Sequence, residues 1–425
     1  MNLSGKLTSN PSDVALTTDT STTAATKSLR AVHAGISGFP FGSAAVNKCI
    51  AVYSSVRTLN TDVLVINNRA VHQKDKDRLI PKEGTIQGLR YTYTCPTPYR
   101  PNSFLKRNLN ALAGRFGELL LLIRLGLTRK IDVLFYYPTN GSFFELIGYR
   151  VLSKLFGFAL IAHYVEYRTA FSERINFIDK WKHRLYDRYF MHFTDAILPI
   201  SEFLIDHLRK SNYRGRILKV PPLVDFSSFE SAEVQYENPN FLYVGTAAYY
   251  NAISFITTAF DLVDESPFYL HLVVNGDVRD MRRIETLVSQ MKKRDRVKIF
   301  TKLPYRELLD LYKSATALLI PLSGSVTDVA RFPQKVSEYL ASGNPVITTA
   351  YGEMAFYFTD GINALIASEY TPESFAVKMN YVIHHAQESR IIGRNGFETG
   401  KRYFDINSYS VALKKMMLSI LDKGK

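Results

Sequence analysis

The segment Phe332–Thr348 carries the residues best suited to chemistry in this chain. Pro333 stands where a helix could begin, because proline is tolerated in a first helical turn. The backbone N–H groups near Phe332–Lys335 would then form a helix start that suits an anion such as a diphosphate. Lys335 adds a cation to this turn, and Glu338 lies one turn further on, within reach of a vicinal diol such as a ribose. The residues alone leave open the alternative of an ordinary capped surface helix.

Two series of apolar strands and helices must position these residues. Strands are predicted at 31–37, 62–67, 131–136, 159–163 and 196–200, and helices at 45–58, 105–127 and 178–190. After the proline-bearing link 219–225 the pattern restarts, with strands at 241–245, 269–275, 297–300, 317–321 and 345–349 and helices at 252–262, 281–293, 305–314 and 335–342. Continuous apolar strands are typical of parallel sheets covered on both faces. The chain is therefore predicted to be α/β, with two Rossmann-like, doubly wound domains whose loops face a shared interdomain cleft.

The domain boundaries follow from composition. Residues 1–27 are rich in Ser and Thr and lack the apolar core of a signal peptide, so we expect a disordered leader. We assign 28–222 to an N-terminal domain that binds the acceptor and 223–400 to a C-terminal domain that binds the donor nucleotide. Residues 401–425 are expected to form a helix that could cross back to the N-terminal domain.

The basic excess lies almost wholly in the first half. Residues 1–230 hold 31 Lys and Arg against 18 Asp and Glu, whereas residues 231–425 hold 22 against 21. Such asymmetry favours an acidic partner. The mixed basic and apolar stretches 105–130 and 180–188 could dock on an anionic membrane face, or could be helices that face the core with solvated charges. No nucleic-acid recognition module is visible, and nucleic acid is not expected as a partner.

Cysteine content and hydropathy indicate the cellular compartment that we expect for the protein. Cys49 and Cys95 cannot build a disulfide framework and are expected to be reduced. No Cys/His spacing fits zinc, so no metal is expected. No apolar run reaches the roughly 20 residues that span a bilayer. We expect a cytoplasmic protein, peripheral at most on the inner face of the membrane.

The segment around Glu338 resembles the signature helix of glycosyltransferase family 4, the retaining GT-B enzymes also called glycosyl transferases group 1. Glu338 and the following Tyr-Leu-Ala-Ser-Gly-Asn-Pro-Val-Ile match the second glutamate of the family's Glu-x7-Glu stretch and the run after it. The resemblance implies a GT-B fold and transfer from a nucleotide diphosphate sugar with retention of configuration, without cofactor or metal. It also implies that Glu338 binds the ribose hydroxyls.

The same resemblance extends to other positions. Gly245 ends a stretch that looks like the family's opening strand of the nucleotide domain, and the stretch after 297–300 looks like the one that holds the base through its main chain, which implies that role for Thr301, Lys302 and Leu303. The loop 38–44 is similar to the glycine loop near the donor phosphates, which implicates Gly42 and Ser43. His163 stands where a family histidine contacts the donor sugar, but a packed histidine is the alternative. Glu166 and Arg168 are acceptor candidates, and Glu166 could equally be a local ion-pair partner.

Two departures from the family pattern matter. Ala330 stands where the family has its first glutamate, and the loop 246–251 lacks the family's diphosphate-binding Arg and Lys. Lys335, Arg331 and the helix N-terminus around Phe332 are then the candidates to stabilise the leaving group.

The chain is therefore predicted to be a metal-independent glycosyltransferase that acts on a glycan or lipid-linked acceptor, in cell-surface polysaccharide synthesis. Two other readings remain open. One is a non-catalytic relative that binds a glycan or a partner enzyme, and the other is a nucleotide-sugar epimerase.

Overall fold

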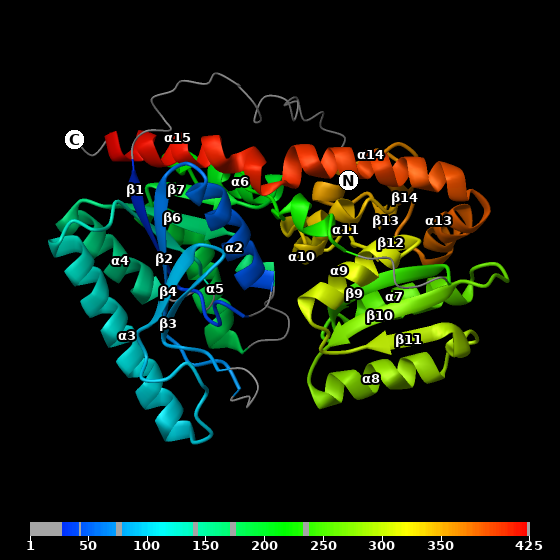
Figure 1. Cartoon of the computed structure of the whole chain (residues 1–425), viewed down its shortest axis with the longest axis horizontal. Helices are drawn as coiled ribbons and strands as arrows, with labels where there is room; N and C mark the ends of the chain where they lie inside the picture. The colour runs from blue at the N-terminus through cyan, green and yellow to red at the C-terminus, as the bar shows by residue number, and fades with distance from the viewer. Residues whose placement is uncertain are drawn as a thin grey trace.

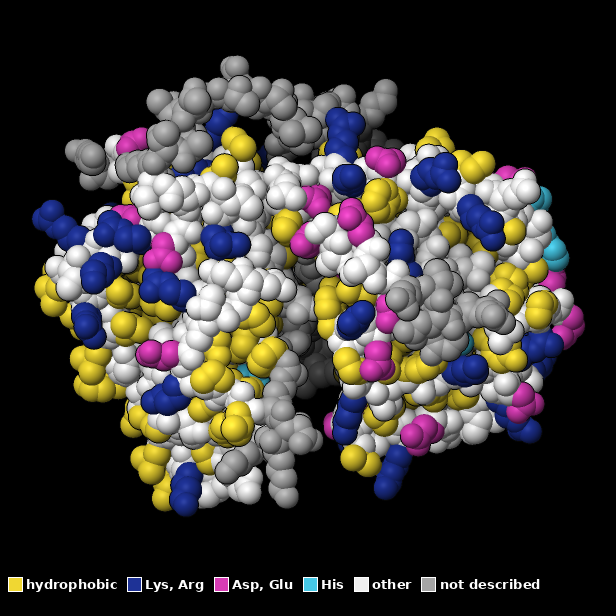
Figure 2. Space-filling view, in the orientation of Figure 1, with side chains coloured by type: hydrophobic (Ala, Val, Ile, Leu, Met, Phe, Trp, Pro, Cys, Tyr) yellow, Lys and Arg dark blue, Asp and Glu magenta, His cyan; other side chains and the backbone are white. Residues whose placement is uncertain are grey.

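The computed structural model describes residues 28–41, 44–73, 79–138, 143–170, 176–232 and 238–422. These residues form two α/β units side by side, each built on its own sheet (Figure 1). The space-filling view shows a hollow between the two units (Figure 2). The fold class is as the strand–helix alternation predicts, with two Rossmann-like domains. The predicted leader, 1–27, lies outside the described residues.

The N-terminal sheet has eight strands, and apart from β3 neighbouring strands run parallel. Their order across the sheet is β3 (Glu83–Ile86), β4 (Leu89–Tyr93), β2 (Thr61–Asn67), β1 (Leu29–Ala34), β5 (Val133–Tyr136), β6 (Ala159–Tyr164), β7 (Ala196–Pro199) and β8 (Arg216–Ile217). Since β1 lies in the middle, the strand order reverses there, as in doubly wound folds.

Helices cover both faces of this sheet. One core contains Val32, Leu134 and Leu160 of the strands together with the buried sides of α3 (Phe104–Leu127), α4 (Phe143–Phe156), α5 (Phe177–Tyr189) and α6 (Glu202–Lys210). The residues that alternate with them, such as Val133 and Ile161, pack against α2 (Ala44–Arg57) on the other face. This alternation explains why the strands read as continuous apolar runs.

The C-terminal sheet has six parallel strands in the order β11 (Val297–Phe300), β10 (Tyr269–Asn275), β9 (Asn240–Thr246), β12 (Ala317–Ile320), β13 (Val346–Thr349) and β14 (Leu365–Ala367). Counted from β9, this is the 3-2-1-4-5-6 order of dinucleotide-binding sheets, and its switch point lies between β9 and β12. One face carries α7 (Tyr250–Asp261), α8 (Val278–Ser289) and α13 (Pro372–His384). The other carries α9 (Tyr305–Ser314) and α11 (Lys335–Ser342), and the short helices α10 (Val326–Ala330) and α12 (Glu353–Tyr357) follow β12 and β13.

The end of the chain connects the two units. Helix α14 (Ala386–Phe404) packs on α11, and α15 (Ser410–Leu421) lies across the N-terminal domain beside α2 (Figure 1). The buried ammonium of Lys414 donates to the carbonyl oxygens of Leu59 and Asn60 at 2.8 and 3.3 Å. The two domains are thus fastened by a helix as well as by the link after β8.

Several elements differ from the sequence-based prediction. The strand expected at 31–37 is β1 at Leu29–Ala34, and 401–425 is not one helix, since α14 ends at Phe404 and α15 begins at Ser410. The helix expected at 281–293 is wrong at both ends, because α8 starts at Val278, where the Asp277 side chain accepts a hydrogen bond from the Asp280 N–H at 2.9 Å. The hairpin of β3 and β4 was not predicted. Its turn residues Gln87 and Gly88 both have positive φ, 48° and 77°, as a two-residue type I′ turn requires.

A candidate donor site at the switch point of the C-terminal sheet

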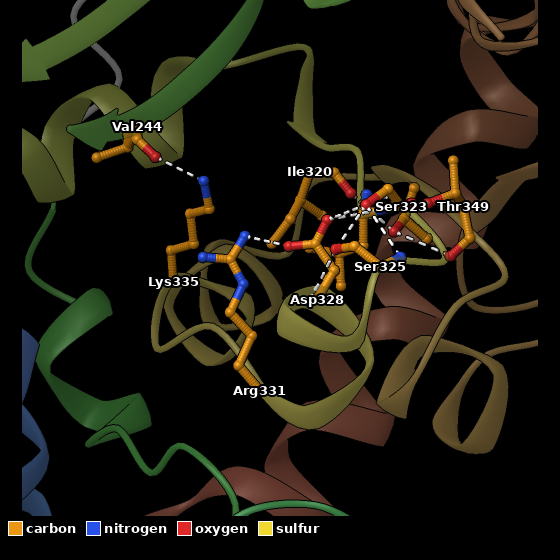
Figure 3. Close-up of polar contacts among 10 residues, drawn as sticks. Val244, Ile320, Ser323, Ser325, Asp328, Arg331, Lys335 and Thr349 are labelled. Carbon is orange, nitrogen blue, oxygen red and sulfur yellow. Dashed lines mark hydrogen bonds and ion pairs between the residues drawn. The ribbon is translucent and has the colours of Figure 1, made fainter. Parts of the chain in front are cut away.

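The carboxyl ends of β9 and β12 mark the place where a doubly wound sheet binds its ligand. In Figure 1 the arrowheads of β10 and β11 point toward the N-terminal domain, so this edge faces the hollow between the domains. The close-up in Figure 3 shows Ser323, Ser325 and Asp328 gathered near Ile320 and Thr349, at the ends of β12 and β13. Arg331 lies beside Asp328, and Lys335 reaches across to Val244 in β9.

Lys335 is the first residue of α11 and reaches the end of β9. Its Nζ donates to the Val244 carbonyl oxygen at 2.8 Å (Figure 3). The same Nζ lies 4.0 Å from the centre of the Tyr243 ring. Burial lowers the pKa of this ammonium to about 7, and the nearby Arg331 guanidinium acts in the same direction. The helix start has no side-chain cap, since Gln334 donates instead to the Leu223 carbonyl oxygen. A cation and a helix start without a side-chain cap therefore meet at one point, which suits a diphosphate. The Val336 N–H is already bonded to the Pro333 carbonyl oxygen, at 3.1 Å.

Arg331 is not a free cation. Its Nη2 donates to Asp328 Oδ1 at 2.5 Å, and its guanidinium lies over the Tyr249 ring at 4.5 Å. The other Asp328 oxygen accepts from the backbone N–H and the hydroxyl of Ser323, at 2.8 and 2.6 Å (Figure 3). The expected cation is thus present beside Lys335, but its charge is compensated.

Glu338 lies on the same side of α11 as Lys335, three residues further on. Only 6% of it is exposed. Oε2 accepts from the Tyr312 hydroxyl at 3.0 Å and Oε1 from the Tyr305 hydroxyl at 3.5 Å. Burial raises the pKa of this carboxyl to about 7, while the two tyrosine hydroxyls lower it. A buried carboxylate with one long hydrogen bond retains capacity to accept from a ligand hydroxyl.

The two tyrosines were missed by the sequence analysis. Tyr305 and Tyr312 are seven residues apart on α9 and therefore lie on one helix face. Their spacing was visible in the sequence, but only the packing of α9 against α11 shows that they meet Glu338.

The loop after β11 has the geometry of a main-chain binding segment. Lys302 has a φ of 54°, and its N–H donates to Asn275 Oδ1 at the end of β10, at 2.7 Å. Thr301 and Lys302 are exposed and Leu303 is partly buried. Gly245, the last residue but one of strand β9, lies next to the Val244 carbonyl that holds Lys335. These positions therefore surround the same sheet edge.

Phe332 cannot offer its side chain to a ligand. Its ring is 3% exposed and packs between Tyr357 and Phe404, at centroid distances of 5.6 and 5.5 Å. Only its backbone remains available, as the helix-terminus argument requires. Ala330 is also buried, and its carbonyl oxygen accepts from the Ser201 hydroxyl of the N-terminal domain at 2.6 Å. The position of the family's first glutamate is thus part of the domain contact.

His163 lies inside the N-terminal domain, 1% exposed. The Tyr53 hydroxyl bridges its Nε2, at 2.9 Å, to His33 Nδ1, at 2.7 Å. Burial lowers the pKa of His163 well below its usual range, with Lys48 and His33 acting in the same direction. Both rings are therefore neutral, and since one hydroxyl donates only once, one ring nitrogen must donate to Tyr53. His163 is therefore a packed histidine, which was the alternative to a contact with the donor sugar.

The remaining candidates are scattered along the N-terminal domain. Arg168 is buried, donates to the Pro138 carbonyl oxygen and lies over the Tyr186 ring at 5.0 Å. Glu166 is exposed. Gly42 and Ser43 lie outside the described residues. Across the part of the chain that the structure describes, no group of three or more His, Cys, Asp and Glu side chains could hold a metal ion.

An ion network at the domain contact was not foreseen. Lys219 Nζ lies 2.6 Å from Glu353 Oε2 and 2.9 Å from Glu202 Oε1, and the Glu202 N–H donates to Glu353 at 2.6 Å. Lys219 and Glu353 are buried. Because these residues come from both domains, the network couples the link and α6 to α12.

The comparisons with known proteins agree with this architecture. Residues 226–399 match the model of the family "Glycosyl transferases group 1". An uncharacterised glycosyltransferase of Methanocaldococcus jannaschii is 21% identical over 229 residues, which cover 52% of this chain and 60% of that protein, so the alignment spans less than two thirds of the relative.

Solved structures extend the likeness to the whole fold. Sucrose-phosphate synthase of Thermosynechococcus elongatus superposes with a TM-score of 0.71 at 15% identity, over 93% of this chain and all of that one. HepE of Anabaena, solved with UDP and glucose, gives a TM-score of 0.65 at 12% identity over the same shares. The C-terminal domain thus matches the group 1 glycosyltransferases over residues 226–399, and the two domains of the chain have the GT-B fold.

Proposed function

We propose that the chain transfers a sugar, with retention of configuration, from a nucleotide diphosphate sugar to a glycan or lipid-linked acceptor. The observation that carries this proposal is the pairing of Lys335 and Glu338 on one side of α11, at the switch point between β9 and β12. An anion-binding group and a buried hydroxyl-binding carboxylate one turn apart match the two polar parts of a nucleoside diphosphate.

Each part of the donor has a place in this arrangement. The diphosphate lies at the start of α11, where Lys335 and the backbone N–H groups offset the charge that grows on the leaving group. The ribose hydroxyls donate to Glu338, and the base lies against the backbone of Thr301, Lys302 and Leu303. No cofactor or metal ion takes part in this scheme. Since HepE was solved with UDP and glucose, UDP-glucose is the first donor to test.

The part of the proposed site that faces the donor sugar lacks the family's first glutamate, because Ala330 stands at that position. In the proposed site, Asp328 and Arg331 are the polar groups that flank Lys335 on that side. The ion pair holds both groups in place through Ser323. We assign to this pair the orientation of the sugar hydroxyls, with Arg331 also adding positive potential near the diphosphate.

The acceptor lies on the N-terminal domain, across the hollow from α11. Glu166 is the exposed candidate for contact with it, whereas His163 and Arg168 support the domain from within. We further propose a cytoplasmic enzyme of cell-surface polysaccharide synthesis.

A second candidate is a non-catalytic relative that binds the nucleotide sugar without transferring it. The burial of Ala330 at the domain contact favours it, because no carboxylate can extend from that position toward the donor.

Calorimetric titration with UDP, UDP-glucose and a panel of other nucleotide sugars, without added metal, tests the proposal. We expect saturable binding. Lys335→Met should weaken this binding, whereas the control Asp310→Asn on α9 should not. Release of nucleoside diphosphate from the bound donor, by hydrolysis or on addition of a glycan acceptor, would exclude the non-catalytic reading. Absence of binding to every nucleotide would overturn the donor site itself.

A further inference from the structure

The side of helix α3 that packs against the domain is not its most apolar side, unlike the helices of an ordinary globular domain. Its buried residues are Asn110, Gly114, Glu118, Leu122 and Gly126, an i, i+4 row that is mostly small or polar. Two of the glycines allow close packing, since a side chain at Gly114 would meet the Asn68 backbone and one at Gly126 the Phe156 ring. Near the end of the helix Leu122 is buried, and Leu121, Ile123 and Leu125 pack against the same core. The large apolar residues of the preceding turns face elsewhere.

They face outward as one stripe along α3. Exposed large apolar side chains recur at helical spacing and are 51–74% exposed: Phe104, Leu105, Leu109, Leu112, Phe116 and Leu120. The stripe does not belong to the core, so the alternative of a core-facing amphipathic helix is wrong for these six residues and holds only for the last turns of α3. An apolar surface of this length is unusual for a monomeric protein in water and indicates an interaction site.

The neighbouring helices continue this surface. On α4, Phe144, Val151 and Leu155 are 86%, 59% and 70% exposed. On α5, Phe177, Ile178 and Trp181 are 83%, 64% and 59% exposed. Helix α4 packs beside α3, and η3 (Phe190–Phe193), which follows α5, contacts both α5 and α4. We call the outward side of α3, α4 and α5 the outer helical face. Figure 2 shows yellow and dark-blue side chains mixed along the outer edge of the domain where α3 and α4 lie.

The charges on the outer helical face are mainly positive. Exposed cations alternate with the apolar residues, among them Lys106, Arg124, Lys154, Arg184 and Arg188. The Asp and Glu side chains of the three helices are either buried or lie in ion pairs. Glu118 and Asp187 are buried, Glu145 lies 3.2 Å from Arg115, and Asp179 lies 3.1 Å from Lys182.

The combination of exposed apolar residues and exposed cations indicates which kind of partner fits the outer helical face. A second copy of the chain would bring the same cations together across a twofold axis, which is repulsive. The cores of protein interfaces are depleted of charge, and a nucleic acid offers phosphates but no apolar phase for a leucine stripe. An anionic lipid surface supplies both, because the acyl boundary takes the apolar side chains and the head groups pair with the cations.

The orientation places the surface next to the proposed acceptor side. Helices α4 and α5 begin near the carboxyl edge of the sheet, since each connects the end of one parallel strand to the start of the next. Phe144, Phe177 and Ile178 are in their first turns. No helix in the described ranges is long and apolar enough to cross a bilayer.

We propose that the outer helical face docks the N-terminal domain on an anionic membrane, with α3 lying in the plane of the interface. The inference goes beyond glycosyl transfer and does not depend on it, because it needs neither donor nor acceptor. It does supply a reason for the proposed acceptor to be lipid-linked, since a membrane-bound substrate would meet the cleft at its rim.

Trp181 makes a direct test possible, because it is the single tryptophan of the chain and lies on the outer helical face. The full chain is mixed with vesicles of phosphatidylcholine alone and of phosphatidylcholine with an equal amount of phosphatidylglycerol. We expect cosedimentation with the anionic vesicles only, weakened by salt. Trp181 emission should shift to shorter wavelength and be quenched by brominated acyl chains.

Variants separate the contributions. The double change Leu112→Ser with Phe116→Ser should weaken vesicle binding by on the order of tenfold or more. Each of Lys106→Gln and Arg184→Gln should weaken it roughly fivefold. The matched control is Val377→Ser with Ile391→Ser, two residues of the C-terminal domain that are 64% and 61% exposed, and it should bind like the parent.

Donor titration of the same variants keeps the two proposals apart, because Leu112→Ser with Phe116→Ser should leave donor affinity unchanged. Three outcomes would overturn the membrane proposal. They are no binding to anionic vesicles, binding that the double change does not affect, and a lipid-free dimer that the double change dissociates.

Discussion

Replacing Glu338 with glutamine should make the protein more stable and a poorer binder of its donor. The carboxyl is 6% exposed, and burial raises its pKa from 4.5 to about 7. A raised carboxyl pKa means that the folded state disfavours the charge. The stability cost is absent below pH 4.5, grows between pH 4.5 and pH 7, and is constant above pH 7.

The magnitude follows from the pKa difference. One pKa unit is worth about 1.4 kcal/mol, so the ionised carboxylate costs about 3 kcal/mol at pH 8. Glutamine keeps an oxygen that can accept from the Tyr312 hydroxyl. Glu338→Gln should therefore raise the free energy of unfolding by up to about 3 kcal/mol at pH 8 and leave it nearly unchanged at pH 4. The loss of two charge-assisted hydrogen bonds to ribose should weaken donor binding roughly tenfold to a hundredfold.

Urea denaturation at the two pH values and calorimetric titration with the donor measure both effects. Glu307→Gln is the matched control, since this carboxylate on α9 is exposed, and it should change neither. A lower stability of Glu338→Gln at pH 8 would refute the reasoning, because it would mean that the two tyrosines stabilise the charge. An unchanged donor affinity would remove the ribose from this position.

Three further outcomes are expected. Lys335→Met should weaken donor binding at least tenfold at pH 7. In the parent protein, donor affinity should fall as the pH rises above about 7, and calorimetry in buffers of different ionisation enthalpy should show proton uptake on binding. A donor affinity that does not change with pH would contradict the role of this ammonium. Lys219→Met leaves Glu353 buried without its cation and should lower the free energy of unfolding by about 3–5 kcal/mol in urea titrations, whereas an effect under 1 kcal/mol would mean that water replaces the lysine. Tyr53→Phe removes the bridge to His163 and should destabilise the protein by about 1–3 kcal/mol without changing donor affinity, and a selective loss of donor affinity would instead give this cluster a binding role.

Local patterns determined the fold class and much of the candidate donor site. The apolar strands, their spacing and the breaks at Gly and Pro depend on neighbouring residues only, so α9 and α11 could be predicted with the bounds that the structure has. Because the carboxyl ends of parallel strands share an edge, Gly245 and Lys335 could be expected near one another before any coordinates were known.

Tertiary packing decided what these residues do. The sequence alone could not show that Asp328 neutralises Arg331 or that Tyr312 holds Glu338, because each contact joins elements whose register depends on the whole domain. It also left the leucines of α3 open to two interpretations. An amphipathic stripe is the same pattern whether it faces a core or a membrane, and only the packing of Gly114 and Gly126 against the domain shows that the stripe faces outward.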